Sequence, residues 1–263
     1  MSISEENHPE HAEILTGGNM NAPERIGSTV RRKTTPASPT IHRLLTHLRG
    51  KGIDWVPTFH GIADDGREIL SYLDGEVPHE LPPWLWEEDL LVGVARAMRT
   101  FHDAAADFDQ SGAVWGLDPS EPAEVICHND FAPYNCVFRD GAFAGLLDFD
   151  LCSPGSRIWD MAYCCYRFVP IMPVAREDPT DETAPFPLSE VLRRSDTFLD
   201  AYAGENGTLR YTCSQLFSVA SRRLEKLASW TGDFAVRTGS SELEKNARMY
   251  ARHSRWLLWL SRL

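Results

Sequence analysis

The segment 125–150 (VICHNDFAPYNCVFRDGAFAGLLDFD) constrains the fold more than any other part of the chain. A short apolar strand leads into a loop that carries Asp130 and ends at Asn135, and the next residues predict a β-hairpin that turns at an Asp-Gly pair. Asp148 follows where the second hairpin strand ends. A loop that feeds a hairpin in this way brings Asp130, Asn135 and Asp148 to the same end of two paired strands.

Three oxygen-bearing side chains that converge beside an apolar hairpin are suited to phosphoryl transfer. Mg²⁺ takes oxygen ligands and keeps part of its coordination shell for phosphates, so one carboxylate and one amide carbonyl suffice for the protein's share. The remaining carboxylate can accept the proton of an attacking hydroxyl group. Each element alone has an ordinary alternative, since aspartates at hairpin ends are often only turn formers.

Composition limits the classes of protein that fit. The chain has 263 residues, of which 43% are hydrophobic and 24% charged, as in folded globular proteins. It has no apolar run long enough to span a membrane and no signal-peptide pattern, so we expect a cytoplasmic protein. The formal charge of −12 disfavours nucleic acid and membrane surfaces as partners and favours the approach of a cationic substrate. The sequence leaves the oligomeric state open.

The order of predicted elements divides the chain near Gly75. Residues 1–12 are expected to form a flexible tail, and 13–75 a strand-rich lobe with a single helix at 40–51. Residues 76–263 are expected to be mainly helical, with helices at 84–108, 188–202, 211–230 and 241–260 and an acidic, proline-rich loop between the second of these and the hairpin.

The motif H-N-D-x-x-x-x-N followed by D-F-D resembles the catalytic loop and metal motif of the protein-kinase-like superfamily. It is closer to the aminoglycoside phosphotransferase family, whose loop reads H-G-D-x-x-x-x-N and whose metal motif lacks the usual final glycine. The run Gly155–Asp160 is similar to a later G-x-x-x-x-D run of that family. The motifs cover about a fifth of the chain, and the order of elements agrees over most of the rest.

The resemblance implies a two-lobed, protein-kinase-like α+β fold with a small antiparallel-sheet N-terminal lobe and a larger, mainly helical C-terminal lobe. ATP or GTP and Mg²⁺ would lie in the cleft between the lobes. By the resemblance, Asp130 is the catalytic aspartate, Asn135 and Asp148 are the Mg²⁺ ligands, and His128 and Asp160 support the loop. It further implies an aminoglycoside-like or amino-alcohol acceptor and a link to antibiotic resistance.

The nucleotide lobe is predicted from weaker signals. Gly17, Gly18 and Asn19 form a turn whose backbone N–H groups could approach phosphates, although a plain hairpin turn explains them as well. On the following strand Arg31 and Arg32 point to opposite faces, and the register favours Arg31 as the phosphate-binding cation while leaving Arg32 open.

Two further features of this lobe stay open. Ser71 and Leu73 are expected in the connection between lobes whose backbone meets the adenine, with an ordinary edge strand as the alternative. The helix after the arginines contains no acidic residue, so the cation lacks the glutamate partner that the family carries there.

Asp150, two residues beyond Asp148, is interpreted first as a cap of the following turn, and otherwise as a source of negative potential at the metal or a contact for a cationic substrate. We therefore predict a phosphotransferase that moves the γ-phosphoryl group of ATP or GTP to a hydroxyl of a small molecule. The missing helix glutamate keeps a catalytically silent, nucleotide- or partner-binding relative as the alternative. A protein kinase is disfavoured, because no A-P-E sequence follows Asp148.

Overall fold

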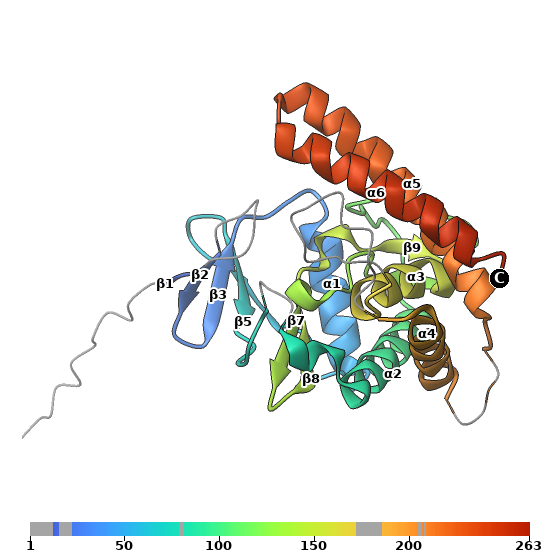
Figure 1. The fold of residues 1–263 in the computed structure, drawn as a ribbon. Helices are drawn as coiled ribbons and strands as arrows, with labels where there is room; N and C mark the ends of the chain where they lie inside the picture. Colours follow the sequence, from blue (N-terminus) through green and yellow to red (C-terminus); the bar gives the residue numbers. More distant parts are fainter. Residues whose placement is uncertain (1–12, 16–22, 79–81, 172–185, 205–206, 208) are drawn as a thin grey trace, which may run out of the picture.

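The computed structural model describes residues 13–15, 23–78, 82–171, 186–204, 207 and 209–263. A small antiparallel sheet forms one side of the molecule, and a larger, mainly helical part forms the other (Figure 1). The predicted two-lobed, kinase-like α+β fold is therefore confirmed. The division at Gly75 into separate domains stays a prediction.

The N-terminal sheet has five strands in the order β1-β2-β3-β5-β4. Their bounds are β1 Glu13–Ile14, β2 Glu24–Ile26, β3 Thr29–Arg32, β4 Phe59–Ile62 and β5 Glu68–Ser71. A glycine with positive φ, Gly27, turns the chain between β2 and β3. The pairing of β3 with β5 sets Arg32 directly opposite Glu68, a register that brings two opposite charges together.

Helix α1 (Ser38–Gly50) follows the sheet's third strand and begins two residues earlier than the sequence predicts. Pro39 lies in its first turn, where the missing N–H group costs nothing. Its buried face consists of Ile41, Leu44, Leu45 and Leu48, as the apolar spacing indicates.

The connection between the two parts is fixed to the hairpin. The N–H and C=O groups of Glu76 exchange hydrogen bonds of 2.8 Å with those of Phe138. Gly75 precedes this bridge with a φ of +144°, and a Cβ at this position would collide with Val137 and the Phe138 carbonyl. The chain therefore leaves the sheet along a narrow path that only glycine can follow.

The helical part contains the elements after Gly75. A single-turn helix, Pro83–Trp86, precedes α2 (Glu88–Ala105), which therefore begins later than predicted because Pro83 starts a separate turn. The remaining helices are α3 (Arg157–Phe168), α4 (Leu188–Ala203), α5 (Cys213–Thr238) and α6 (Ser241–Leu260). Helix α5 runs eight residues beyond the predicted end, and α5 and α6 pack along each other as a long hairpin (Figure 1).

The predicted strand and hairpin are present. Strand β6 (Val125–Cys127) pairs with β9 (Ser153–Gly155), and β7 (Cys136–Arg139) pairs with β8 (Ala142–Leu146). Beneath them Phe101 of α2 meets the rings of His128 and Phe149, all fully or almost fully buried. The loop and hairpin thus rest on the main core.

Within the described residues, no helix combines the length and apolar character that a membrane crossing requires.

The substitution Gly75→Ala should destabilise the protein by about 2 to 4 kcal/mol, because its Cβ would lie 2.5 Å from Val137 Cγ1 and 2.6 Å from the Phe138 carbonyl oxygen at a strained φ. Urea-induced unfolding measures this. As a control, Gly93→Ala lies inside α2 with no atom within 4 Å of the added carbon. It should leave stability unchanged or raise it by up to about 1 kcal/mol. Equal losses for both variants would contradict the assigned path of the connection.

Candidate active site

The carboxylate of Asp130 is held by side chains of its own loop. Asn135 Nδ2 donates to Asp130 Oδ2 at 2.8 Å and to the Asp130 carbonyl at 2.9 Å. The hydroxyl of Tyr134 donates to Asp130 Oδ1 at 2.6 Å. Because the side-chain nitrogen of Asn135 donates to Asp130, its side-chain oxygen Oδ1 is the atom that can act as a metal ligand. The role of Tyr134 was not foreseen from the sequence.

The end of the hairpin is tied to this loop. The N–H group of Leu147 donates to the Asn135 carbonyl at 2.8 Å, and His128 Nε2 lies 2.9 Å from the Leu147 carbonyl. The next residue, Asp148, has the left-handed φ of +57°, and its side chain is 52% exposed. The structure thus brings Asp130, Asn135 and Asp148 to one end of the hairpin, as the sequence predicts, and leaves the Asp148 carboxylate accessible to a cation.

Asp160, at the start of α3, holds the loop from below. Its two oxygens accept hydrogen bonds from the N–H groups of His128 at 2.7 Å and Asn129 at 2.8 Å. His102 Nε2 of α2 lies 3.1 Å from Oδ2. Burial by itself would raise the pKa of Asp160, but the hydrogen bond with His102 and the charge of Arg223 outweigh it and lower the pKa below 3.8. The carboxylate is therefore ionised and fixes the backbone ahead of Asp130.

The cation that faces Asp148 is Arg32. Its Nη2 lies 2.7 Å from Asp150 Oδ1, its Nη1 lies 3.4 Å from Asp148 Oδ1, and its Nε lies 2.5 Å from Glu68 Oε1. Burial acts to lower the pKa of Arg32, but Asp150, Glu68 and Asp148 more than offset this and raise it. Arg32 is the one arginine of the pair that reaches across from the sheet to the metal motif.

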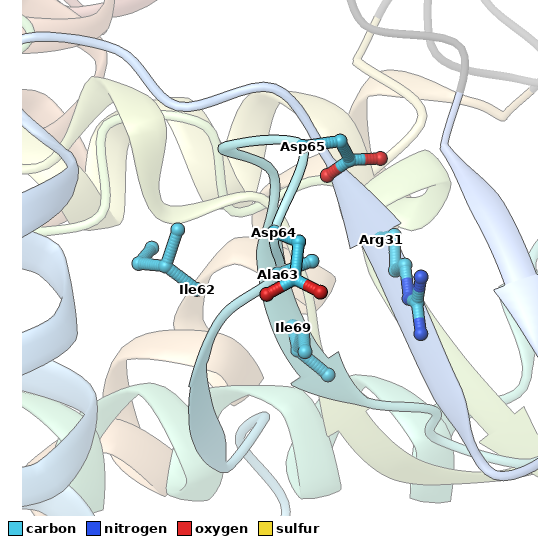
Figure 2. A pocket seen from close by; sticks show the side chains of 6 residues that line it. All are labelled: Arg31, Ile62, Ala63, Asp64, Asp65 and Ile69. Carbon is cyan, nitrogen blue, oxygen red and sulfur yellow. The ribbon is translucent and has the colours of Figure 1, made fainter.

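Arg31 lies on the other face of β3, so its position does not support the preference for Arg31, and which arginine binds phosphate stays a prediction. Figure 2 shows its side chain beside the β4–β5 turn, in a hollow lined by Ile62, Ala63, Asp64, Asp65 and Ile69. None of the residues that line this hollow belongs to the catalytic loop or the metal motif. Strand alternation separates the two arginines, and the pairing of β3 with β5 sets Arg32 opposite Glu68.

The expectation that this cation lacks an acidic partner is wrong. Glu68, on β5 and 1% exposed, pairs with Arg32 through Oε1 and with His42 Nε2 of α1 through Oε2, each at 2.5 Å. His42 also stacks on Phe59, with ring centres 3.7 Å apart. The carboxylate thus comes from a neighbouring strand, and the helix supplies an imidazole in its place. Sequence spacing alone does not reveal this pair, because Glu68 lies opposite Arg32 only in the register of β3 and β5.

Asp150 has a different role from the predicted turn cap, because it forms the shortest contact that Arg32 makes with the metal motif. Ser71 is the last residue of β5 and Leu73 follows the strand, and their contact with the adenine stays a prediction. The Ser71 hydroxyl accepts a hydrogen bond from the Thr58 N–H group, and the Leu73 side chain lies against Gly145 of β8. Gly17, Gly18 and Asn19 lie outside the described residues, as does the acidic loop at 177–182.

The oxygen donors at the hairpin end suit a hard cation. Among the residues that the structure describes, no group of three or more His, Cys, Asp or Glu side chains is arranged to hold a metal ion by itself. Asn135 and Asp148 would supply two oxygens, a set that fits Mg²⁺, which completes its shell with phosphate oxygens and water.

A family model described as the phosphotransferase enzyme family matches residues 70–186 of this chain, which include the loop, the hairpin and the metal motif. A curated relative, the trifolitoxin immunity protein of Rhizobium leguminosarum bv. trifolii, is 34% identical over 159 residues. That match covers 58% of this chain and 60% of the relative, so the chain spans about three fifths of the relative's length.

Solved structures share the whole fold at low sequence identity. A protein of Ralstonia eutropha JMP134, described as a candidate aminoglycoside phosphotransferase, superposes with a TM-score of 0.68 at 14% identity, over 96% of this chain and 92% of the other. Choline kinase from Cryptosporidium parvum gives 0.64 at 12% identity, over 96% and 90%. The streptomycin–ATP complex of APH(2″)-IIa gives 0.54 at 15% identity, over 91% and 93%. The family match and these folds confirm the resemblance to the aminoglycoside phosphotransferases.

The substitution Glu68→Gln should lower the free energy of unfolding by about 2 to 4 kcal/mol, because it removes a buried charge that Arg32 and His42 both contact. Chemical denaturation measures the change. Glu24→Gln, in the same sheet, is the control: it removes the Glu24–Arg67 pair at 2.6 Å, whose side chains are 25% and 29% exposed. We expect the control to cost less than about 1 kcal/mol. A Glu68 variant as stable as the control would show that the pair contributes little.

The substitution Asp160→Asn should destabilise the protein by roughly 2 to 4 kcal/mol at neutral pH, because an amide cannot accept hydrogen bonds from both loop N–H groups. Since the folded pKa of Asp160 is depressed, its contribution is present above the unfolded pKa and is lost as pH falls through the folded pKa. The difference between wild type and variant should therefore shrink as pH falls below about 4.

Urea midpoints across an acid titration measure this difference. Asp103→Asn is the control, because Asp103 is 46% exposed and pairs with Arg99 and Arg157 at the surface. A gap between wild type and Asp160→Asn that stays constant with pH would argue against an ionised Asp160.

Proposed function

We propose that this chain, which matches the phosphotransferase enzyme family over its catalytic loop, transfers the γ-phosphoryl group of ATP or GTP to a hydroxyl of a small molecule. The observation that carries the proposal is the Asp130 carboxylate held by Asn135 at the hairpin end where Asp148 lies exposed. A hydroxyl that approaches Asp130 can donate its hydrogen bond and then its proton to this carboxylate. Positioning and charge stabilisation are what phosphoryl transfer requires of a protein.

In this proposal the side-chain oxygen Oδ1 of Asn135 and the Asp148 carboxylate would hold Mg²⁺, which would supply positive charge against the charge that develops on the phosphates. His128, Asn129 and Asp160 keep the loop in place from beneath. The ATP complex of a structural neighbour supports a nucleotide as donor.

Arg32 is proposed as the group that contacts the donor phosphates. Its two terminal nitrogens lie near Asp148 and Asp150, which is the position where phosphate oxygens and a metal would meet. An arginine presents a planar pair of donors to a phosphate, where a lysine would present a single charge. Ser71, Leu73 and the Gly17–Asn19 turn remain proposed contacts of the nucleotide.

The acceptor is proposed within the amino-alcohol or aminoglycoside-like class, to which the names of the structural neighbours point. The curated relative is named as an immunity protein, which supports a role in resistance to an antibiotic or toxin. We place the activity in the cytoplasm, where nucleoside triphosphates are available and where the six free thiols would stay reduced. The nucleotide would lie between residues 13–75 and 76–263.

The motive for a catalytically silent protein was the missing acidic partner of the cation. Glu68 supplies that partner from β5, so this observation no longer favours the silent alternative. Measured turnover then distinguishes an active phosphotransferase from a catalytically silent relative.

Mg-ATP at about 100 times its Kd should stabilise the protein by about 2.7 kcal/mol in a thermal shift assay. The variant Asp130→Asn should keep that stabilisation and lose roughly 10²- to 10⁴-fold in turnover, because it removes only the proton acceptor. Asp140→Asn is the matched control: Asp140 is an exposed residue of the hairpin turn at a φ of +52°, which asparagine adopts readily. Unchanged turnover in Asp130→Asn, or no shift with Mg-ATP, would sink the proposal.

A further inference from the structure

The side of Asp130 that faces α3 is lined by tyrosines and an arginine. The Tyr134 hydroxyl, which donates to Asp130, also lies 3.0 Å from the Tyr163 hydroxyl of α3. The guanidinium carbon of Arg167 lies 5.0 Å from the centre of the Tyr134 ring and 5.9 Å from that of Tyr166. A cation therefore rests on the same ring whose hydroxyl contacts the catalytic carboxylate.

No carboxylate among the residues that the structure describes balances the positive charge of Arg167. In the ranges that the structure describes, no aspartate or glutamate forms an ion pair with it, and its buried Nε has no hydrogen-bond partner. Burial disfavours the charged form, but the hydroxyls of the surrounding tyrosines outweigh this and raise the pKa of Arg167. Arg167 is half-buried and has no carboxylate partner among the described residues, so an incoming anion would stabilise its charge.

Arg32 and Arg223 also lie near the loop, and both contact acceptor oxygens. Arg32 contacts three carboxylates on the nucleotide side. Arg223 donates to both the side chain and the backbone carbonyl of Asn129, and its charge helps to lower the pKa of Asp160. The excess positive charge on the α3 side of Asp130 thus belongs to Arg167, although the chain as a whole carries −12.

A polycationic acceptor needs carboxylates around it, and this wall offers hydroxyls and a guanidinium. The hydroxyl of Tyr134 occupies the position on Asp130 that an acceptor hydroxyl must take. We infer that the acceptor is a hydroxyl compound that also carries an oxyanion, a carboxylate or a phosphate, which binds Arg167 while its hydroxyl replaces that of Tyr134 on Asp130. This inference rests on the proposed phosphotransferase activity and changes its acceptor class, because the acceptor must carry an oxyanion whether or not it also carries an amine.

The reaction then balances as an ordinary phosphoryl transfer. The acceptor oxygen forms a bond to the γ-phosphorus, the bond from that phosphorus to the β-phosphate bridging oxygen breaks, and the nucleoside diphosphate leaves. The acceptor proton passes to Asp130 and from there to solvent. Arg167 binds a part of the acceptor that does not react, so it acts on recognition.

Matched acceptors that differ in charge test the inference. We would compare 4-hydroxybutyrate with 4-hydroxybutanamide, and glycerol 3-phosphate with glycerol, with choline as a cationic hydroxyl compound. Wild type should prefer at least one oxyanion to its neutral partner by about tenfold or more in kcat/KM. The two pairs distinguish a carboxylate from a phosphate as the source of the oxyanion.

The variant Arg167→Met should abolish that preference through KM, and Arg167→Lys should keep part of it. Arg222→Met removes a charge at an exposed position of α5 and should leave the preference intact. Thermal unfolding with Mg-ATP shows whether each variant is folded and still binds nucleotide, which separates loss of recognition from loss of structure.

Two results would overturn the inference. One is an equal loss of turnover with every acceptor in Arg167→Met, which would mean that Arg167 only balances the charge of Asp130. The other is a wild-type enzyme that binds Mg-ATP but shows no preference for either oxyanion over its neutral partner, or that prefers choline. In both cases turnover is still measured, so the proposed phosphotransferase activity would stand; its own failure is seen as the absence of turnover with every acceptor.

Discussion

The buried carboxylate of Asp160 is the group on which the geometry of the site depends. It joins three elements at one point. It lies on α3, accepts hydrogen bonds from the N–H groups of the loop, and contacts α2 through His102. Asn129 adopts a φ of +65° beside it, a conformation that needs support from outside the loop. Without an ionised acceptor at this position, the loop would have two buried N–H groups to satisfy, and Asp130 would lose its fixed direction.

On the side of the sheet, a carboxylate again contacts a histidine and also an arginine, but these residues come from other elements. The cation is an arginine, its carboxylate partner comes from the neighbouring strand, and the helix contributes His42. Since Arg32 and Glu68 are opposite each other in the register of β3 and β5, the sheet itself positions the pair. The orientation of Arg32 therefore depends on strand pairing more than on the placement of α1.

The parts of the site that could be predicted are those with local signals. The Asp-Gly turn and the spacing from Asp130 to Asn135 and Asp148 are readable within a few residues of each other, and the structure brings these residues together. Glu68 could not be predicted, because its partnership with Arg32 is fixed by a register between distant segments. Helix α3 was missed since most of its faces are buried, which removes the polar-apolar alternation that marks a surface helix. Tyr134 was missed because its contact with Asp130 depends on a side-chain direction that no spacing encodes.

The contact between Arg32 and Asp150 also bears on how the cleft is filled. These two residues come from the sheet and from the metal motif, so their ion pair joins the two parts of the molecule directly. In the proposed reaction, a nucleotide with its magnesium ion would carry a substitute for each of them: phosphates for the arginine and a dication for the aspartates. Binding would then exchange one set of counter-ions for another, which costs less than removing water from isolated charges.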